Sequence, residues 1–191
     1  MPRLKVGDKL PRFTFNTAYR NGVGIYDSIA GHPLTLLWVL RYIGCTTCRY
    51  DVHVLSQRYE EFRRLGAQLF VVMQSEPQTV REDLKDAAIP FDIICDTDME
   101  LYELLEVRAA PSKEARTPTD PVQVEKLAEK KRKIKELGFV HGKYEGNEQQ
   151  LPALFIVDEE GTVRYAHYAV NSIDMPTADE ALKLLSLLRQ E

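Results

Sequence analysis

The sequence has little of what disulfide-built scaffolds, membrane proteins and nucleic-acid-binding domains need. It contains three cysteines, too few for a scaffold held by disulfides. Its longest apolar run, Leu36–Leu40, is far too short to cross a membrane, and the N-terminal residues lack the apolar region of a secretory signal. A net charge of -4 argues against bulk attraction to nucleic acid. We therefore expect a cytoplasmic protein without a membrane or nucleic-acid partner.

The composition is that of an ordinary globular protein. Apolar residues make up 44% of the 191 positions, and charged residues make up 28%. A chain of this length buries most of the surface that its unfolded form exposes, so it needs neither a metal nor disulfides to build a core. We expect a single domain over residues 1–191, with no cofactor and no metal site.

Strand and helix patterns alternate along the chain, which predicts an α/β fold with a central mixed β-sheet flanked by helices. Asn21-Gly22 predicts an N-terminal β-hairpin, and the looser alternation of Val23, Ile25 and Ile29 places them in its second strand. The apolar run Leu34–Leu40 predicts a central strand covered on both faces. Further patterns predict strands at 69–73, 91–95, 154–157 and 163–168, and helices at 48–66, 78–87, 99–106 and 178–188.

Residues 108–150 differ in composition from the rest of the chain and predict a helical insertion. This segment holds ten of the 25 basic residues, three prolines and few large apolar side chains. Asp120 is the predicted N-cap, Pro121 fits the first helical position, and Gln123 has the capping-box spacing. We expect a surface helix that begins at Pro121 and ends before Gly138.

The most informative motif is Cys45-Thr46-Thr47-Cys48, a C-x-x-C at the point where the predicted central strand passes into a helix. Free N–H groups and the positive end of the helix dipole stabilise a thiolate there and lower the pKa of its cysteine. We expect Cys45 at the exposed cap as the reactive thiolate. Cys48 begins the buried helix face one turn later, close enough to form a disulfide with Cys45.

Three interpretations of this pair stay open: a redox dithiol, part of a zinc site and an inert pair. A C-x-x-C near a β-α-β pattern favours redox chemistry. A zinc site needs four ligands, and neither Cys95 nor the four scattered histidines have a ligand spacing. Cys95 ends a predicted buried strand, where a free cysteine is usually a small hydrophobic residue and alternatively a resolving thiol.

Two polar features outside the dithiol also have functional interpretations. His141 is either a solvated loop histidine or a proton carrier near the site. The run Lys130–Lys135 contains five basic residues in six, but it lacks interleaved aromatic residues and is flanked by glutamates. We expect this run to be a solvated helix face rather than a nucleic-acid site.

Four segments of the chain together carry a family resemblance: Val6–Pro11, Leu40–Arg49, Gln149–Phe155 and Asp174–Thr177. They resemble the peroxiredoxin-like, AhpC/TSA-type branch of the thioredoxin superfamily, and the resemblance covers nearly the whole chain. It implies a thioredoxin-like fold, in which a cis-proline begins the strand that faces the dithiol. From the residues alone, the bond before Pro152 is expected to be trans, as most Xaa-Pro bonds are.

The chain departs from true peroxiredoxins at three positions. Those enzymes carry P-x-x-x-T-x-x-C, and when their peroxidatic cysteine is placed on Cys48, Cys45 replaces the threonine and Arg41 replaces the proline. Pro152 stands where the family usually has an arginine that polarises the peroxide. Compared with the family pattern, these three differences favour a thioredoxin-like dithiol over a peroxide site.

We predict a thiol-disulfide oxidoreductase, a peroxiredoxin-like antioxidant protein, in which Cys45 attacks a substrate disulfide and Cys48 resolves the intermediate. Arginines on either side of the pair would favour a thiolate or bind a substrate anion, or else pair locally at the surface. The predicted substrate-binding residues are Leu151, Pro152, Arg41 and Arg49.

Two other functions stay open at this point. One is a thiol peroxidase, in which Cys48 becomes a sulfenic acid and Cys45 condenses with it. The other is a non-catalytic thioredoxin-fold binding module. The expected substrate is a protein disulfide or a hydroperoxide, and a thioredoxin-type protein is the expected reductant. The resemblance also implies that the chain forms a homodimer.

Overall fold

A central sheet of five strands organises the molecule. The computed structural model describes residues 2–85, 87 and 89–190, and in these ranges the strand order is β5-β4-β3-β6-β7. β3 pairs in parallel with β4 and antiparallel with β6, so the sheet is mixed, as predicted. The strands are β3 (Leu34–Val39), β4 (Ala67–Met73), β5 (Asp92–Cys95), β6 (Ala153–Asp158) and β7 (Val163–Tyr168).

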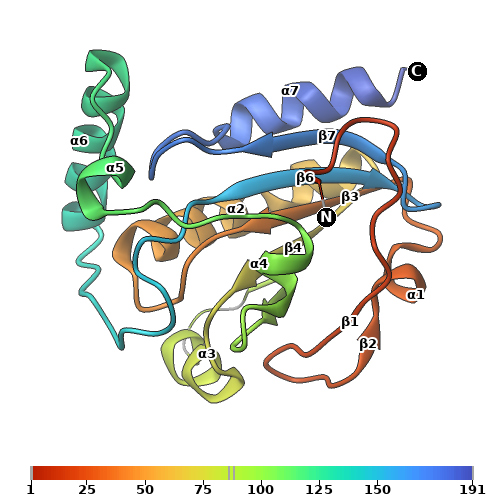
Figure 1. Cartoon of the computed structure of the whole chain (residues 1–191), viewed down its shortest axis with the longest axis horizontal. Helices are drawn as coiled ribbons and strands as arrows, with labels where there is room; N and C mark the ends of the chain where they lie inside the picture. The colour runs from red at the N-terminus through yellow and green to blue at the C-terminus, as the bar shows by residue number, and fades with distance from the viewer. Residues whose placement is uncertain (1, 86, 88, 191) are drawn as a thin grey trace.

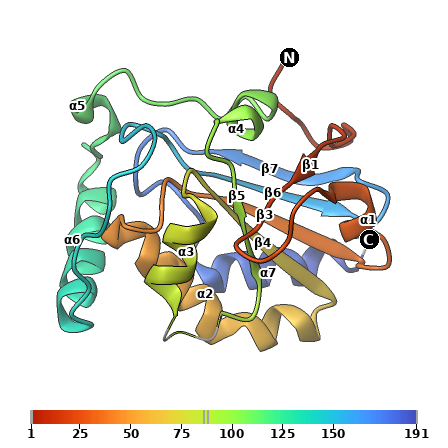
Figure 2. The ribbon, with the colours of Figure 1, turned by 90° about the horizontal axis from the view of Figure 1, so that it is seen from below.

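Helices cover both faces of this sheet (Figures 1 and 2). One face packs against α2 (Thr46–Arg64), α3 (Pro77–Leu84) and α7 (Ala178–Leu188). The opposite face packs against the short helices α1 (Ile25–Ile29) and α4 (Glu100–Leu104). Leu36 and Trp38 of β3 belong to the first core, and Leu37 and Val39 belong to the second. Because successive strand residues point to opposite faces, a strand covered on both sides is apolar along its whole length.

The predicted N-terminal hairpin is present, but its second strand is shorter than predicted. β1 (Thr14–Phe15) pairs antiparallel with β2 (Val23–Gly24). Ile25 and Ile29, which the alternation assigned to that strand, lie in α1 instead and are both buried. Residues four positions apart lie on the same face of a helix, so this spacing buries both side chains in one helical turn.

The predicted insertion contains two helices, α5 (Lys113–Arg116), which was not predicted, and α6 (Pro121–Glu136). Asp120 caps α6 as predicted, because its Oδ1 accepts hydrogen bonds from the second and third N–H groups of the helix at 3.0 and 3.1 Å. The Gln123 side chain binds Asn171 at 2.7 Å instead of completing a capping box. Figure 1 shows α6 beyond one end of the sheet, near the start of α2.

Several other element ends differ from the prediction. The helix predicted at 78–87 is α3, which ends at Leu84, while residue 86 lies outside the described residues. The helix predicted at 99–106 is α4, and it begins after Met99, which has a left-handed backbone with φ 62°. In the parts of the chain that are described, no helix combines the length and the apolar character needed to cross a membrane.

Candidate active site

Cys45 caps the N-terminus of α2, which places its sulfur at the start of the helix. The residue has an extended backbone (φ -72°, ψ 119°), and its Sγ accepts a hydrogen bond from the backbone N–H of Cys48 at 3.4 Å. The side chain at this position is usually the oxygen acceptor of Ser, Thr, Asp or Asn. With a sulfur in that place, the free N–H groups and the helix dipole stabilise negative charge on Cys45.

Two further side chains contact the Cys45 sulfur. Arg41 Nη2 donates a hydrogen bond to Sγ at 2.8 Å, and Thr47 Oγ1 lies 3.1 Å from it. The Arg41 guanidinium is fixed from the other side by the backbone oxygen of Glu148, which accepts a hydrogen bond from Nη1 at 2.7 Å. A single guanidinium therefore connects the sulfur to the segment that precedes β6.

The two cysteines have opposite pKa shifts. A hydrogen bond from the Cys48 side chain lowers the pKa of Cys45 well below its ordinary value, and the Arg41 charge and Thr47 lower it further against the effect of burial. The same hydrogen bond raises the pKa of Cys48 well above its ordinary value, together with burial and the Cys45 charge. The geometry thus favours a thiolate on Cys45 and a proton on Cys48.

Both cysteines are covered by protein, although the sequence led us to expect an exposed Cys45. Cys45 is 2% exposed and Cys48 is 5% exposed. Part of the cover is the segment that follows α6, where the Gly142 N–H donates a hydrogen bond to the Gly44 backbone oxygen at 2.8 Å. A Cβ atom at Gly44 would collide with the backbone oxygen of Lys143, so this close approach requires glycine at position 44.

His141 belongs to the same cover. Its Nε2 lies 3.3 Å from the hydroxyl of Tyr42, and its ring stacks on Tyr144 with the centroids 4.1 Å apart. The Tyr42 hydroxyl donates a hydrogen bond to Glu148 Oε1, also at 3.3 Å. Among the described residues, His141 thus contacts Tyr42, Tyr144 and the Gly142 backbone oxygen, and it makes no hydrogen bond with either cysteine of the dithiol.

A cavity of about 290 Å³ opens beside the dithiol. Cys48, Arg41 and Thr47 line it, and so does Trp38 of β3. Its other walls are residues of α6 and of the loop before α7, among them Lys126, Lys130, Lys133, Ile173 and Met175. The insertion therefore supplies one wall of a cavity in which Cys48, rather than Cys45, contributes to the surface.

The structure separates the four predicted substrate-binding residues. Arg41 and Pro152 line the cavity, and Leu151 lies partly buried next to Pro152. Arg49 instead donates a hydrogen bond to the Asp83 backbone oxygen at 2.7 Å and thereby connects α2 to α3. In the described ranges no peptide bond is cis, so the Leu151-Pro152 bond is trans. This confirms the expectation from the residues, whereas the cis-proline implied by the family resemblance is wrong.

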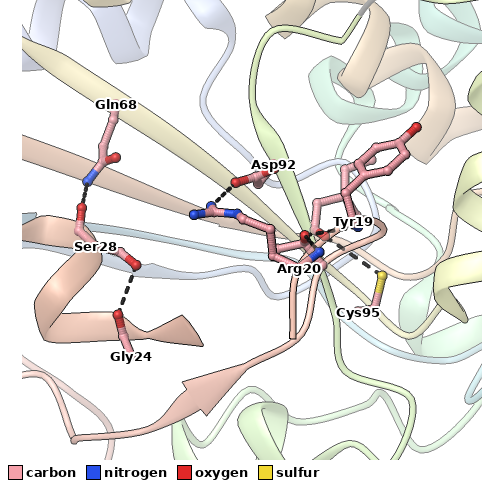
Figure 3. Close-up of polar contacts among 9 residues, drawn as sticks. Tyr19, Arg20, Gly24, Ser28, Gln68, Asp92 and Cys95 are labelled. Atoms are coloured by element: carbon pink, nitrogen blue, oxygen red, sulfur yellow. Dashed lines mark hydrogen bonds and ion pairs between the residues drawn. The ribbon is translucent and has the colours of Figure 1, made fainter. Parts of the chain in front are cut away.

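Cys95 lies on the edge strand β5, two strands away from β3. Figure 3 shows Cys95 together with the Arg20–Asp92 ion pair, whose Asp92 belongs to the same strand. The thiol donates a weak hydrogen bond to the backbone oxygen of Ile93 at 3.7 Å, and burial raises its pKa to about 12. These surroundings favour a small buried hydrophobic residue over a resolving thiol. Among the described residues, no cluster of three or more His, Cys, Asp or Glu side chains is arranged to hold a metal ion.

Sequence reasoning missed the side chains that the insertion brings to the site. Arg116 of α5 has a lowered pKa because of burial and the nearby charge of Arg41. Lys130 of α6 was expected to face solvent, but its side chain is 12% exposed and contacts Asp51 of α2 at 2.6 Å. No motif or periodicity connects residues so far apart in the chain, so neither contact had a signal in the sequence.

Solved structures of similar fold include redox proteins. The yeast mitochondrial 1-Cys peroxiredoxin aligns with a TM-score of 0.71 and 14% identity, over 98% of this chain and 77% of that chain. A mutant of peroxiredoxin 6 from Arenicola marina gives a TM-score of 0.72 and 13% identity, over 97% and 74%. A candidate thiol:disulfide interchange protein DsbE from Chlorobium tepidum gives 0.61 and 17%, over 98% and 99%.

At these identities the likeness establishes the fold, which is the thioredoxin-like fold of peroxiredoxins. No curated protein gives a significant match to the sequence. The model of the AhpC/TSA family, in contrast, matches residues 6–166, which include the dithiol and Pro152. Because this match spans most of the sequence, the chain belongs to the AhpC/TSA family.

Proposed function

We propose that the protein catalyses thiol-disulfide exchange, with Cys45 as the attacking thiolate and Cys48 as the resolving thiol. Membership of the AhpC/TSA family supports a thiol-dependent redox function in general. The observation that carries the specific reaction is the position of Cys45 Sγ, which accepts hydrogen bonds from the Cys48 N–H and, at 2.8 Å, from Arg41 Nη2. A disulfide is attacked by a thiolate, and these contacts stabilise that form on Cys45.

The reaction proceeds in two exchanges. Cys45 attacks one sulfur of the substrate disulfide, a mixed disulfide forms, and the other substrate sulfur leaves as a thiolate. Cys48 then loses its proton to this thiolate and attacks Cys45, which releases the second substrate sulfur and leaves a Cys45–Cys48 disulfide. Loss of the negative charge on Cys45 removes one cause of the raised pKa of Cys48. The mixed disulfide thereby makes Cys48 easier to ionise when it is needed.

Substrate access requires a movement of the cover, because Cys45 is 2% exposed. Arg41 and Thr47 both contact the sulfur and both line the cavity, so displacement of the Arg41 side chain would open a path from the cavity to Cys45. A thioredoxin-type protein would return the protein disulfide to the dithiol. These roles, a cytoplasmic location and a homodimer are parts of the proposal.

One observation favours a second candidate function, that of a thiol peroxidase. Cys48, and not Cys45, lines the cavity beside the dithiol. In this reaction the Cys48 thiolate attacks the terminal oxygen of a hydroperoxide and the O–O bond breaks. An alcohol is released, and Cys48 is left as a sulfenic acid. Cys45 then condenses with the sulfenic acid, and water leaves as the disulfide forms.

Serine variants separate the two reactions. The Cys48→Ser protein, incubated with a disulfide substrate, should accumulate a mixed disulfide on Cys45 that intact-mass and peptide mass spectrometry detect. The Cys45→Ser protein should form no such adduct and should not accumulate a sulfenic acid on Cys48 with hydrogen peroxide. A stable sulfenic acid on Cys48, without an adduct on Cys45, would mean that the protein is a thiol peroxidase and does not catalyse disulfide exchange. If the thiols stay reduced with both oxidants, the remaining candidate function is that of a non-catalytic binding module.

A further inference from the structure

Two arginines are held by adjacent residues of the segment that precedes β6. Arg41 Nη1 donates a hydrogen bond to the backbone oxygen of Glu148 at 2.7 Å, and Arg116 Nε donates one to Gln149 Oε1 at 3.1 Å. Two adjacent residues of the segment before β6 therefore hold arginines that come from the loop after β3 and from α5. Arg116 was not a predicted site residue.

In the described ranges neither guanidinium is paired with a carboxylate, although Arg41 contacts the Cys45 sulfur. Among the described residues, no carboxylate oxygen lies within ion-pair distance of Arg41 or Arg116, and the side chains of these arginines donate their hydrogen bonds to amide oxygens and to the Cys45 sulfur. Burial lowers the pKa of Arg116, and the charge of Arg41 lowers it further. Arginine pairs of this kind suit the recognition of a carboxylate, which accepts two parallel hydrogen bonds from a guanidinium.

The charges around the adjoining cavity point to the same kind of ligand. Five basic and three acidic side chains line it, and each acidic one is already paired with a lysine or arginine of the same rim. Lys126 donates its hydrogen bond to the backbone oxygen of Met175 at 2.8 Å instead of to a carboxylate. The indole N–H of Trp38, which is 3% exposed, has no acceptor in the structure. An anion with further hydrogen-bond acceptors would satisfy both the excess charge and this donor.

We propose that Arg41 and Arg116 bind the carboxylate of a low-molecular-weight disulfide and that the rest of this molecule occupies the cavity. The proposal rests on the proposed function, since it names the substrate class of the same dithiol. A carboxylate that draws the Arg41 guanidinium away from the sulfur also uncovers Cys45 for attack. In the complete reaction the substrate disulfide is reduced to two thiols, and the Cys45–Cys48 dithiol is oxidised to a disulfide.

The test measures how fast three disulfides oxidise the reduced protein. Glutathione disulfide is anionic, bis(2-hydroxyethyl) disulfide is neutral and cystamine is cationic, so the comparison isolates the effect of substrate charge. Intact-mass spectrometry follows the formation of the protein disulfide. The wild-type protein should react fastest with glutathione disulfide, and added salt should reduce this preference.

The Arg116→Gln variant should lose most of that preference. A hydrogen bond to a charged group corresponds to about a tenfold effect or more, so its rate with glutathione disulfide should fall about tenfold while the rate with the neutral disulfide stays the same. Arg116→Lys should keep part of the preference, because the charge remains. Arg64→Gln removes an exposed arginine from the last turn of α2 and serves as the control for net charge.

Four results would overturn the proposal. Equal loss of rate with all three disulfides in Arg116→Gln would mean that Arg116 only supports the fold. An unchanged preference in that variant, or the same loss in Arg64→Gln, would mean that overall charge selects the substrate. If no disulfide oxidises the wild-type dithiol but a hydroperoxide does, the proposed function itself fails, and the substrate assignment fails with it.

Discussion

Replacement of Arg41 by glutamine tests whether this guanidinium, in addition to the helix, makes Cys45 a thiolate. The variant keeps a polar side chain but loses the charge and the 2.8 Å hydrogen bond to the Cys45 sulfur. A hydrogen bond to a charged group contributes about 1.5 to 3 kcal/mol, and one pKa unit corresponds to about 1.4 kcal/mol. The pKa of Cys45 should therefore rise by about one to two units in Arg41→Gln.

The sign of the pH dependence follows from this shift. In the wild-type protein the lowered pKa keeps Cys45 ionised to a lower pH than an ordinary thiol, so its rate of attack should stop rising at a lower pH. In Arg41→Gln the thiolate should form only at higher pH. The variant should therefore react more slowly than the wild type at neutral pH, and the two rates should approach each other in alkaline solution.

The ultraviolet absorbance of the thiolate, followed through a pH titration of the reduced protein, measures this shift without requiring solvent access to the sulfur. The Cys45→Ser protein supplies the background from other groups. Arg49→Gln is the matched control, because Arg49 is one residue from Cys48 in the sequence but donates its hydrogen bond to the Asp83 backbone oxygen. An unchanged midpoint in Arg41→Gln, or an equal shift in Arg49→Gln, would refute the claim that the Arg41 guanidinium stabilises the Cys45 thiolate.

Three further predictions concern the surroundings of the dithiol. Gly44→Ala should lower the free energy of unfolding by about 1 to 3 kcal/mol in urea denaturation, because the added Cβ would collide with the Lys143 backbone oxygen. Lys130→Met should cost about 1 to 3 kcal/mol by the same measurement, because it removes the 2.6 Å partner of the Asp51 carboxylate, and Asp51→Leu in the same protein should recover part of this loss. Cys95→Ala should leave the rate of dithiol oxidation unchanged in a stopped-flow thiol assay, because a thiol with a pKa of about 12 stays protonated.

The sequence predicts best the elements whose own side chains define their surroundings. β3 is apolar at every position but Thr35 because both faces are covered, and all of its residues are buried as expected. α7 has the predicted bounds 178–188, and Thr177 and Glu180 form a complete capping box at its start. In such elements the hydrophobic pattern and the end signals agree, so local information is sufficient.

Two of the three short helices in the described ranges, α1 and α5, were missed for a physical reason, whereas α4 was predicted. α1 has five residues and α5 has four, and helices of this length are unstable without contacts from the rest of the fold. α5 shows this dependence, because its last residue, Arg116, accepts a backbone hydrogen bond from Ser172 and donates one from its side chain to Gln149. Both partners are distant in the sequence, so no window around α5 contains the information that stabilises it.

The site also divides into a part that local sequence predicts and a part that depends on contacts between distant segments. The positions of Cys45 and Cys48 relative to α2 follow from four consecutive residues at a helix start, and the structure places Cys45 at the N-cap. The contacts of Arg41 with Glu148, of Lys130 with Asp51 and of Arg116 with Gln149 all join segments that only the tertiary fold brings together. The burial of Cys45 was missed for this reason as well, since the cover comes from the insertion.

The residue differences from peroxiredoxins explain why we place the attacking thiolate of the proposed reaction on Cys45. A cation that contacts a thiolate adds to the stabilisation that the Cys48 side chain gives Cys45, and the usual arginine position on the later strand is Pro152 here. Arg41 supplies the cation instead, from the loop that leads into α2, and its Nη2 reaches the cap sulfur of Cys45. The helix dipole acts on both cysteines, whereas the hydrogen bond from Arg41 is made to one of them. In the proposed exchange reaction, the side-chain hydrogen bond from Arg41 to Cys45 favours ionisation of that sulfur, and thus favours Cys45 as the attacking cysteine.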